Sequence, residues 1–279
     1  MKSDEIRKLT SQATDQLIAA LNEGRSETLN HYLAAMARFH RYSLGNIMLI
    51  VSQRRDATRV AGFRTWNKLG RFVKKGEKGI FVLAPIVRRK TENSEQLEVQ
   101  ESTTPAGFRA VYVFDISQTD GQALPVICGV SGDPRHYREQ LGSFVRKLGI
   151  VLEYSEGIAP ALGTSSGGKI TLRPGQASAE EFVTLAHELA HELMHRAKRR
   201  IAISKLVRET EAEAVAFVVS QAIGLEAASA AKDYIELYRG DAALLTESLE
   251  IIQSTANSIL EGIGVEIEVD VASKKIQDR

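Results

Sequence analysis

Cysteine is nearly absent from this sequence, which has only Cys128 among its 279 residues. A single cysteine cannot form an intramolecular disulfide, and it cannot supply the clustered thiolates of a structural zinc site. Any zinc site in this chain must therefore use histidine and carboxylate ligands.

Long hydrophobic runs are also missing. The longest apolar stretch covers residues 79–87 and is too short to cross a bilayer, which takes about 20 apolar residues. The first five residues, MKSDE, carry mixed charge, whereas a secretory signal opens with a basic stretch followed by an apolar one. We therefore expect a cytoplasmic protein with no membrane partner.

The formal net charge is only +1, but it hides two segments of opposite charge. Residues 38–90 contain fourteen Lys and Arg against two acidic residues, a net charge of +12. Residues 180–270 contain seventeen Asp and Glu against eight Lys and Arg, a net charge of −9. This contrast predicts two parts with different tasks, of which the basic one binds an anionic partner.

The hydrophobic pattern predicts an α+β fold. Apolar residues recur at helical spacing over residues 4–53, with Ser43 as the expected N-cap of the third helix. Glycine-punctuated β-rich pieces follow at 59–63, 79–83 and 108–116, which favours a small antiparallel sheet. We therefore predict an N-terminal domain of helices and a small antiparallel sheet over residues 1–125.

The second half, residues 126–279, reads as a mainly helical domain with a short edge sheet. Short strands are expected at 151–153 and 169–172, and an alternating one at 265–271. Ser178 and Glu181 form a capping-box pattern, which predicts a helix that starts near Ala179.

That helix carries the sequence His187-Glu-Leu-Ala-His191. Residues i and i+4 of an α-helix lie about 40° apart around the axis, so both imidazoles point in one direction, as two ligands of one metal must. Glu188 can reach the open side of the metal without being a ligand. It is the expected base of a zinc peptidase, accepting a proton from the water that attacks a peptide carbonyl.

A third ligand is expected from a later helix. Glu209 and Glu213 share one face of it, whereas Glu211 points about 200° away from Glu209. A helical Glu 18 residues after the second histidine resembles the gluzincin arrangement. We therefore predict Glu209 as the third ligand and Glu213 as the residue that supports a histidine from behind.

Alternatives stay open at this stage. A second frame would use His191, Glu192 and His195, but it runs directly into basic residues, so His195 is expected behind the ligands or on the surface. The histidines could also be accidents of a solvated amphipathic helix. Zn²⁺ is the expected ion and Mn²⁺ an alternative, because a site of two histidines and one carboxylate accepts several divalent ions.

Two further features could complete a peptidase site. Tyr234 or Tyr238 could donate to the oxyanion or simply pack. The strand at 169–172 could be an edge along which an extended peptide lies, or an ordinary core strand.

The basic segment between Arg59 and Lys78 combines cations with aromatic residues, as proteins that bind single strands do. Phe63, Phe72 and Phe81 are expected to fill a small core, whereas the cations are expected to face an anionic partner.

The order of several motifs resembles one family. Residues 42–53 (YSLGNIMLIVSQ), 57–66 (ATRVAGFRTW), 69–80 (LGRFVKKGEKGI) and 113–119 (VFDISQT) resemble the N-terminal domain of ArdC-like antirestriction proteins. The C-terminal motifs LAHELAH at 185–191 and ETEAEAVA at 209–216 are similar to the metallopeptidase domain of that family.

The resemblance implies a domain that binds single-stranded DNA, followed by a zincin-type peptidase domain, carriage on a mobile element and protection of incoming DNA from restriction. It supports His187 and His191 as ligands and Glu188 as the base. The DNA-contacting residues expected in the N-terminal domain are Tyr42, Asn46, Arg59, Arg64, Trp66, Lys68, Arg71, Lys74, Lys75 and Lys78.

Three functions remain in competition. The first combines single-stranded DNA binding with cleavage of an unidentified protein or peptide. In the second, the protein only coats the DNA strand and its metal site is structural or vestigial. In the third, the protein is a regulatory peptidase that cleaves a repressor.

Overall fold

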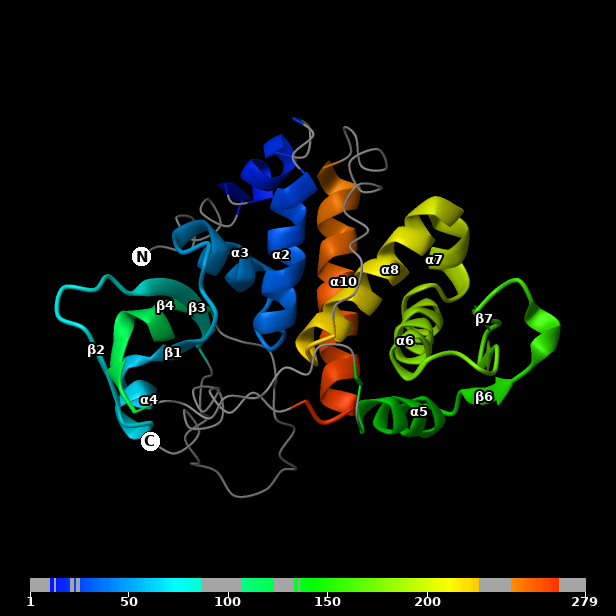
Figure 1. The fold of residues 1–279 in the computed structure, drawn as a ribbon. Coiled ribbons are helices and arrows are strands. Elements are labelled where there is room, and N and C mark those ends of the chain that lie inside the picture. Colours follow the sequence, from blue (N-terminus) through cyan, green and yellow to red (C-terminus); the bar gives the residue numbers. More distant parts are fainter. Residues whose placement is uncertain are drawn as a thin grey trace, which may run out of the picture.

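The computed structural model describes residues 11–12, 14–20, 23, 26–86, 107–122, 133–134, 136–225 and 242–265. They form the predicted α+β fold (Figure 1). A group of helices occupies the centre, and small sheets lie at either side of it. In the part that is described, no helix is both long and apolar enough to cross a membrane.

After the helical residues 14–20, the N-terminal half contains helices α2 (Ser26–Arg38) and α3 (Leu44–Gln53). Ser43 caps α3 as predicted, because its side chain accepts from the backbone N–H of Asn46. Strands β1 (Val60–Gly62), β4 (Phe108–Asp115) and β3 (Ile80–Pro85) then form the predicted antiparallel sheet, in that order.

A smaller antiparallel ribbon extends this sheet region. It consists of β2 (Arg71–Val73) and β5 (Thr119–Gly121), with the short helix α4 (Phe63–Lys68) and the 3-10 turn η1 (Ile116–Gln118) beside it. Helix α4 and strand β2 carry four of the ten predicted DNA-contacting residues, namely Arg64, Trp66, Lys68 and Arg71.

The C-terminal half places helix α5 (Tyr137–Lys147) before a three-stranded sheet. The strands are β6 (Val151–Tyr154), β7 (Gly163–Ser165) and β8 (Lys169–Leu172), in the order β6-β8-β7, and the 3-10 turn η2 (Glu156–Ile158) follows β6. Because β8 pairs with both neighbours, it is a core strand, and the reading of 169–172 as an edge is wrong. The edge beside the histidine helix is β7.

Four helices complete the described structure: α6 (Ser178–Met194), α7 (Ala197–Ala202), α8 (Lys205–Ala222) and α10 (Ala242–Gly262). The helix start near Ala179 is as predicted, but the capping box is not formed. Ala177 is the N-cap, and the Glu181 carboxylate instead accepts from the hydroxyl of Tyr154 at 2.9 Å and pairs with Arg138 at 3.6 Å. The predicted strand at 265–271 lies outside the described residues except for Val265.

One hydrophobic core joins the two halves. It runs from Leu17 to Val265, with α2 packed against α8 and α10 in contact with α3, α5, α6 and α8. The Gln253 amide on α10 donates to the His40 carbonyl at 2.8 Å, which ties the C-terminal helix to the N-terminal half. The predicted boundary between residues 125 and 126 lies outside the described residues.

Candidate metal centre

Three histidines follow one another at single-turn spacing: His187 and His191 lie on α6, and His195 is the residue that caps its C-terminal end. The opposite face of the helix is fully buried in the core through Phe182, Leu185 and Leu189, which explains why the histidine face looks outward toward α8. His187 and His191 keep 21% and 12% of their side-chain surface exposed, whereas His195 is buried.

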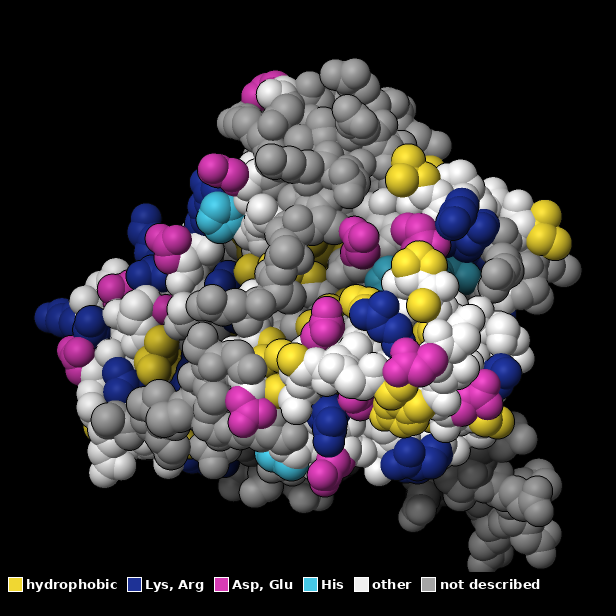
Figure 2. Space-filling view, turned by 45° about the vertical axis from the view of Figure 1, so that its right-hand side comes forward, with side chains coloured by type: hydrophobic (Ala, Val, Ile, Leu, Met, Phe, Trp, Pro, Cys, Tyr) yellow, Lys and Arg dark blue, Asp and Glu magenta, His cyan; other side chains and the backbone are white. Residues whose placement is uncertain are grey.

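The predicted ligands come together at the outer end of this row. The Nε2 atoms of His187 and His191 lie 3.0 Å apart, and Glu209 Oε2 lies 3.5 Å from the first and 3.4 Å from the second. The three residues are the one His/Cys/Asp/Glu cluster with metal-ligand spacing within the described part of the chain. Histidine side chains reach the surface on the face shown in Figure 2, beside acidic and hydrophobic side chains.

These distances fit a single ion. Donors held about 2.0–2.1 Å from one ion at tetrahedral angles lie about 3.3 Å apart, close to all three separations. Three protein ligands also leave one position open, as in catalytic rather than structural zinc sites. The donor set of two imidazoles and a carboxylate suits Zn²⁺, Mn²⁺ and other divalent ions.

Burial keeps both imidazoles in the form that binds metal. Burial lowers the pKa of His191 to about 4, with a further contribution from neighbouring His187, and burial is also the main cause that lowers the pKa of His187. Both side chains are therefore neutral at pH 7 and offer lone pairs to a cation.

Glu188 lies beside this cluster on the sheet side of α6. Burial raises the pKa of its carboxyl to about 7, although a hydrogen bond from Ser165 acts in the opposite direction. Strand β7 approaches so closely that a Cβ atom on Gly163 would lie 2.8 Å from Glu188 Cγ, so only glycine leaves room there. A pKa near neutrality suits a group that accepts and returns protons.

The outer edge of β7 is open beside Glu188. Thr164 lies opposite Thr171 of β8, and the flanking backbone bonds are Arg173 N–H to the Leu162 carbonyl and Ser166 N–H to the Lys169 carbonyl. Because antiparallel pairs alternate, the backbone groups of Gly163 and Ser165 point away from β8. No strand pairs with this side in the part of the chain that the structure describes.

Glu192 and His195, which belong to the second histidine frame, make structural contacts away from the metal position. The Glu192 carboxylate accepts from the backbone N–H groups of Gly167 at 2.8 Å and Gly168 at 2.6 Å, so it holds the turn between β7 and β8. His195 turns away from the cluster and contacts Glu211 on α8. The structure thus brings His187, His191 and Glu209 together, and not the residues of the second frame.

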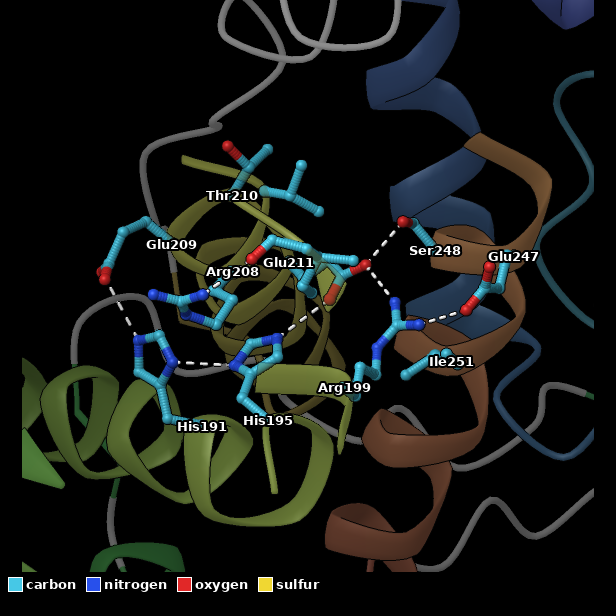
Figure 3. A network of polar contacts seen from close by, with 12 residues as sticks. His191, His195, Arg199, Arg208, Glu209, Thr210, Glu211, Glu247, Ser248 and Ile251 are labelled. Carbon is cyan, nitrogen blue, oxygen red and sulfur yellow. Dashed lines mark hydrogen bonds and ion pairs between the residues drawn. The ribbon is translucent and has the colours of Figure 1, made fainter. Parts of the chain in front are cut away.

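Glu211 is the functional candidate that sequence reasoning missed. It is fully buried and accepts from His195 Nε2 at 2.9 Å, Arg199 Nη2 at 2.6 Å and Ser248 Oγ at 2.5 Å (Figure 3). Burial alone would raise the pKa of Glu211, but the hydrogen bonds from His195 and Ser248 and the Arg199 charge together lower it. The sequence feature that could have pointed to this contact is the i, i+4 spacing of His191 and His195, which puts His195 on the same side of the chain as the ligand His191.

Other predicted residues of the peptidase site lie elsewhere. Glu213 has an exposed side chain one turn after Glu209 on α8, and its supporting role stays a prediction. Tyr234 and Tyr238 lie outside the described residues.

Several residues predicted to contact DNA instead have side chains that are buried or hydrogen-bonded within the N-terminal sheet region. Trp66 has no exposed surface and its indole N–H donates to the Phe114 carbonyl at 2.8 Å, so the prediction that its ring meets DNA is corrected. The Asn46 amide is occupied by both backbone groups of Leu83. The Arg71 guanidinium donates to Thr119 and to the carbonyl of Gln122 in the β5 region.

The remaining predicted cations are more accessible. Tyr42 and Arg59 are half-buried, whereas five cations on α4 and around β2 are exposed: Arg64, Lys68, Lys74, Lys75 and Lys78. Lys and Arg side chains line the left-hand edge of the molecule in Figure 2, on the side of the N-terminal sheet.

Exposed aromatic rings accompany these cations. Phe63 and Phe72, which were expected in a small core, are 52% and 60% exposed, so that expectation is wrong. Phe108 and Tyr112 are also more than half exposed, and their even spacing places both on the same face of β4. Trp66 and Ala61 are the buried residues of this small core instead, and Phe63 and Phe72 do not pack against them.

Comparisons with known proteins agree with this fold. Residues 7–114 match the family model described as the N-terminal domain of anti-restriction factor ArdC. The uncharacterized Bacillus anthracis protein pXO2-81 is 23% identical over 317 residues, which covers 95% of this chain and 53% of the relative. The chain thus spans about half the length of that relative.

Two crystal structures of the antirestriction protein ArdC from plasmid R388 share the fold. The Mn(II)-bound form has a TM-score of 0.54 at 19% identity and covers 92% of this chain and 98% of that chain. The metal-free form has a TM-score of 0.52 at 18% identity, with coverages of 91% and 97%. The family match therefore identifies an ArdC-type N-terminal domain over residues 7–114, and the chain as a whole shares the fold of ArdC.

Proposed function

We propose that this chain is an antirestriction protein that binds single-stranded DNA through its N-terminal sheet and hydrolyses a peptide bond at the His187, His191 and Glu209 centre. The observation that carries the peptidase part is the convergence of three donor atoms within 3.0–3.5 Å, with the buried Glu188 carboxyl beside them. Zn²⁺ and Mn²⁺ are the candidate ions.

The chemistry divides between the ion and the protein. When bound, a divalent ion supplies a Lewis acid that polarises a carbonyl group and makes a water molecule more acidic. Glu188 accepts the proton of the attacking water and returns it to the leaving amine, a task for which a pKa of about 7 is well matched. Ser165 donates to the Glu188 carboxyl and orients it.

The substrate is an extended segment of a protein. The backbone groups of Gly163 and Ser165 on the free side of β7 can pair with such a segment as an added strand. That position would bring a peptide carbonyl close to Glu188, because β7 contacts this side chain directly.

The DNA-binding part rests on a different surface. Lys68, Lys75 and Lys78 are exposed near the exposed rings of Phe63 and Phe72, a combination that suits a single strand. The cations neutralise phosphates and the rings stack on bases, each stacked base contributing about 1–3 kcal/mol.

Two variants separate these activities. Glu188→Gln should retain metal and DNA binding but lose peptide hydrolysis, because an amide cannot accept the proton. The triple replacement of Lys68, Lys75 and Lys78 by Ala should weaken binding of an oligothymidylate and flatten its salt dependence by about 0.7 logarithmic units per lost phosphate contact. Peptide hydrolysis and oligothymidylate binding should be measured for each variant, together with protection of unmodified DNA in a restricting host.

A charge-matched control replaces the exposed cations Arg146, Lys147 and Lys205 of the C-terminal half by Ala. It should leave oligothymidylate binding within about twofold of the parent, because exposed charges far from a ligand contribute little when screened. Equal losses in the two triple variants would contradict a specific DNA surface. Unchanged hydrolysis in Glu188→Gln would contradict the peptidase proposal.

A further inference from the structure

A line of hydrogen bonds leads from the metal position into the protein interior. His191 Nδ1 lies 2.8 Å from His195 Nδ1, and His195 Nε2 lies 2.9 Å from Glu211 Oε2 (Figure 3). His195 and Glu211 have side-chain exposures of only 1% and 0%. The line therefore connects a half-buried ligand to a carboxylate that water does not reach.

The contacts of Glu211 determine which atom donates in the hydrogen bond between Glu211 and His195. Arg199 and Ser248 both donate to Glu211 Oε1, and Arg199 also pairs with Glu247. With the Arg199 charge beside it, Glu211 acts as a carboxylate, which can only accept hydrogen bonds. His195 Nε2 must therefore carry a hydrogen.

The remaining hydrogens follow by counting donors and acceptors. His191 Nε2 faces His187 and Glu209, and a nitrogen that offers its lone pair to a metal there carries no hydrogen. The His191 imidazole then carries its hydrogen on Nδ1 and donates it to His195 Nδ1, 2.8 Å away. His195 Nδ1 accepts this hydrogen, and the hydrogen of His195 lies on Nε2, where Glu211 Oε2 accepts it.

That bare Nε2 atom is the one that faces His187 and Glu209. We infer that Glu211, acting through His195, sets the tautomer and the orientation of His191 so that its lone pair points at the metal position. Glu211 and His195 are thus positioning residues, and the inference rests on the metal centre of the proposed function.

Helix α8 supplies both ends of this arrangement. Glu209 and Glu211 are two positions apart and point about 200° away from each other, so one reaches the outer side of the histidine row and the other the inner side. Among the described residues, the structure gives His187 Nδ1 no comparable partner. The fixed tautomer therefore belongs to His191 rather than to both imidazoles.

The test reads the tautomer directly in the metal-free 279-residue chain. Long-range ¹H–¹⁵N NMR of ¹⁵N-histidine-labelled protein at pH 7.5 distinguishes protonated from bare ring nitrogens. We expect hydrogens on His191 Nδ1 and His195 Nε2. In Glu211→Gln, the amide oxygen must stay on Arg199, so the amide NH₂ group faces His195 and both tautomers should invert.

Metal affinity gives the second readout. Titration with Mn²⁺ and Zn²⁺ should show a 10- to 100-fold weaker affinity in Glu211→Gln, the usual effect of losing a residue that orients a ligand. Ser248→Ala is the matched control. It removes one donor from the same carboxylate and should keep both the tautomer and the affinity within about threefold of the parent.

Three results would overturn the inference: a hydrogen on His191 Nε2 in the parent protein, an imidazolium at His195, or unchanged affinity in a variant whose tautomers have inverted. If Glu211→Gln does not fold by circular dichroism, His195→Asn and His195→Leu replace it. The Asn carbonyl can still accept from His191 Nδ1 and should restore metal affinity relative to Leu, and equal affinities would count against the inference. Neither of these two readouts depends on peptide hydrolysis. A protein that shows the expected tautomers but does not hydrolyse peptides would therefore contradict the peptidase proposal and not this inference.

Discussion

At the scale of the residue, helix geometry was enough to align His187 with His191, whereas Glu209 was predicted from its likeness to the gluzincin arrangement. The structure brings these three residues together. It could not be known from the sequence that Glu211 would meet His195, because that contact depends on how α6 and α8 are placed against each other. The predictions for the aromatic residues were wrong for a related reason, because the burial of Trp66 depends on strands that are distant in sequence.

Glu188 offers a residue-scale prediction for the metal-free protein. Its pKa is about 7 in the folded state against 4.5 for the free side chain, so the folded protein holds this proton where the unfolded chain releases it. The contribution of Glu188 to stability must then fall as pH rises from about 4.5 to about 7. Glu188→Gln removes this effect and should be more stable than the parent at pH 8, by up to about 3 kcal/mol, with a smaller difference at pH 5.

Urea unfolding in the presence of a chelator measures this difference. Glu180→Gln, an exposed change on the same helix, is the control and should give a small difference that is the same at both pH values. A Glu188→Gln variant that is less stable than the parent at pH 8 would contradict the buried, protonated carboxyl.

At the scale of the element, most helices and strands could be predicted because each has a local signal: the Ser43 cap, the apolar periodicity and the glycine-bounded β pieces. The order of strands in a sheet has no such signal. The position of β8 between β6 and β7 follows from pairing over more than a dozen residues, which is why its reading as an edge failed.

Asp115 makes an element-scale prediction, because it fastens the start of β1 to the end of β4. Its carboxylate accepts from the backbone N–H groups of Thr58 at 2.7 Å, Arg59 at 3.0 Å and Ser117 at 2.9 Å. Burial alone would raise the pKa of Asp115, but these bonds and the Ser117 hydroxyl lower it below its usual value. Asp115→Asn should therefore cost about 1–3 kcal/mol of stability at pH 7.

The sign of the pH effect follows from the lowered pKa. The stabilising contribution is present above the unfolded pKa of about 4 and is lost as pH falls through the folded value, so the cost of Asp115→Asn should shrink in acid. Asp120→Asn, in which the replaced side chain is 79% exposed, is the control and should stay within about 0.5 kcal/mol. Thermal unfolding at pH 7 and pH 3 checks both variants, and a cost that grows in acid would contradict the assignment.

At the scale of the whole molecule, the charge contrast in the sequence suggested two separate parts, yet one core crosses between them. Helix α2 packs on α8, and the inner residues of the N-terminal sheet, such as Val82 and Val113, belong to the same cluster as the C-terminal helices. Charge patterns describe the surface, so they carry no information on which halves share an interior.

A shared core predicts a single cooperative unfolding transition. Fluorescence of Trp66, the only tryptophan, reports on the N-terminal sheet, whereas far-ultraviolet circular dichroism reports mainly on the helices. The two signals should give the same urea midpoint. Two separated midpoints would mean that the halves unfold independently.

The central claim is that His187, His191 and Glu209 hold one divalent ion, and metal content tests it most directly. The purified chain, loaded with Zn²⁺ or Mn²⁺ and then dialysed, should contain one equivalent of metal by mass spectrometry. His191→Ala and Glu209→Ala should retain far less than one equivalent, while Glu188→Gln should retain all of it. A full equivalent of metal in a His187→Ala, His191→Ala double variant would contradict the account.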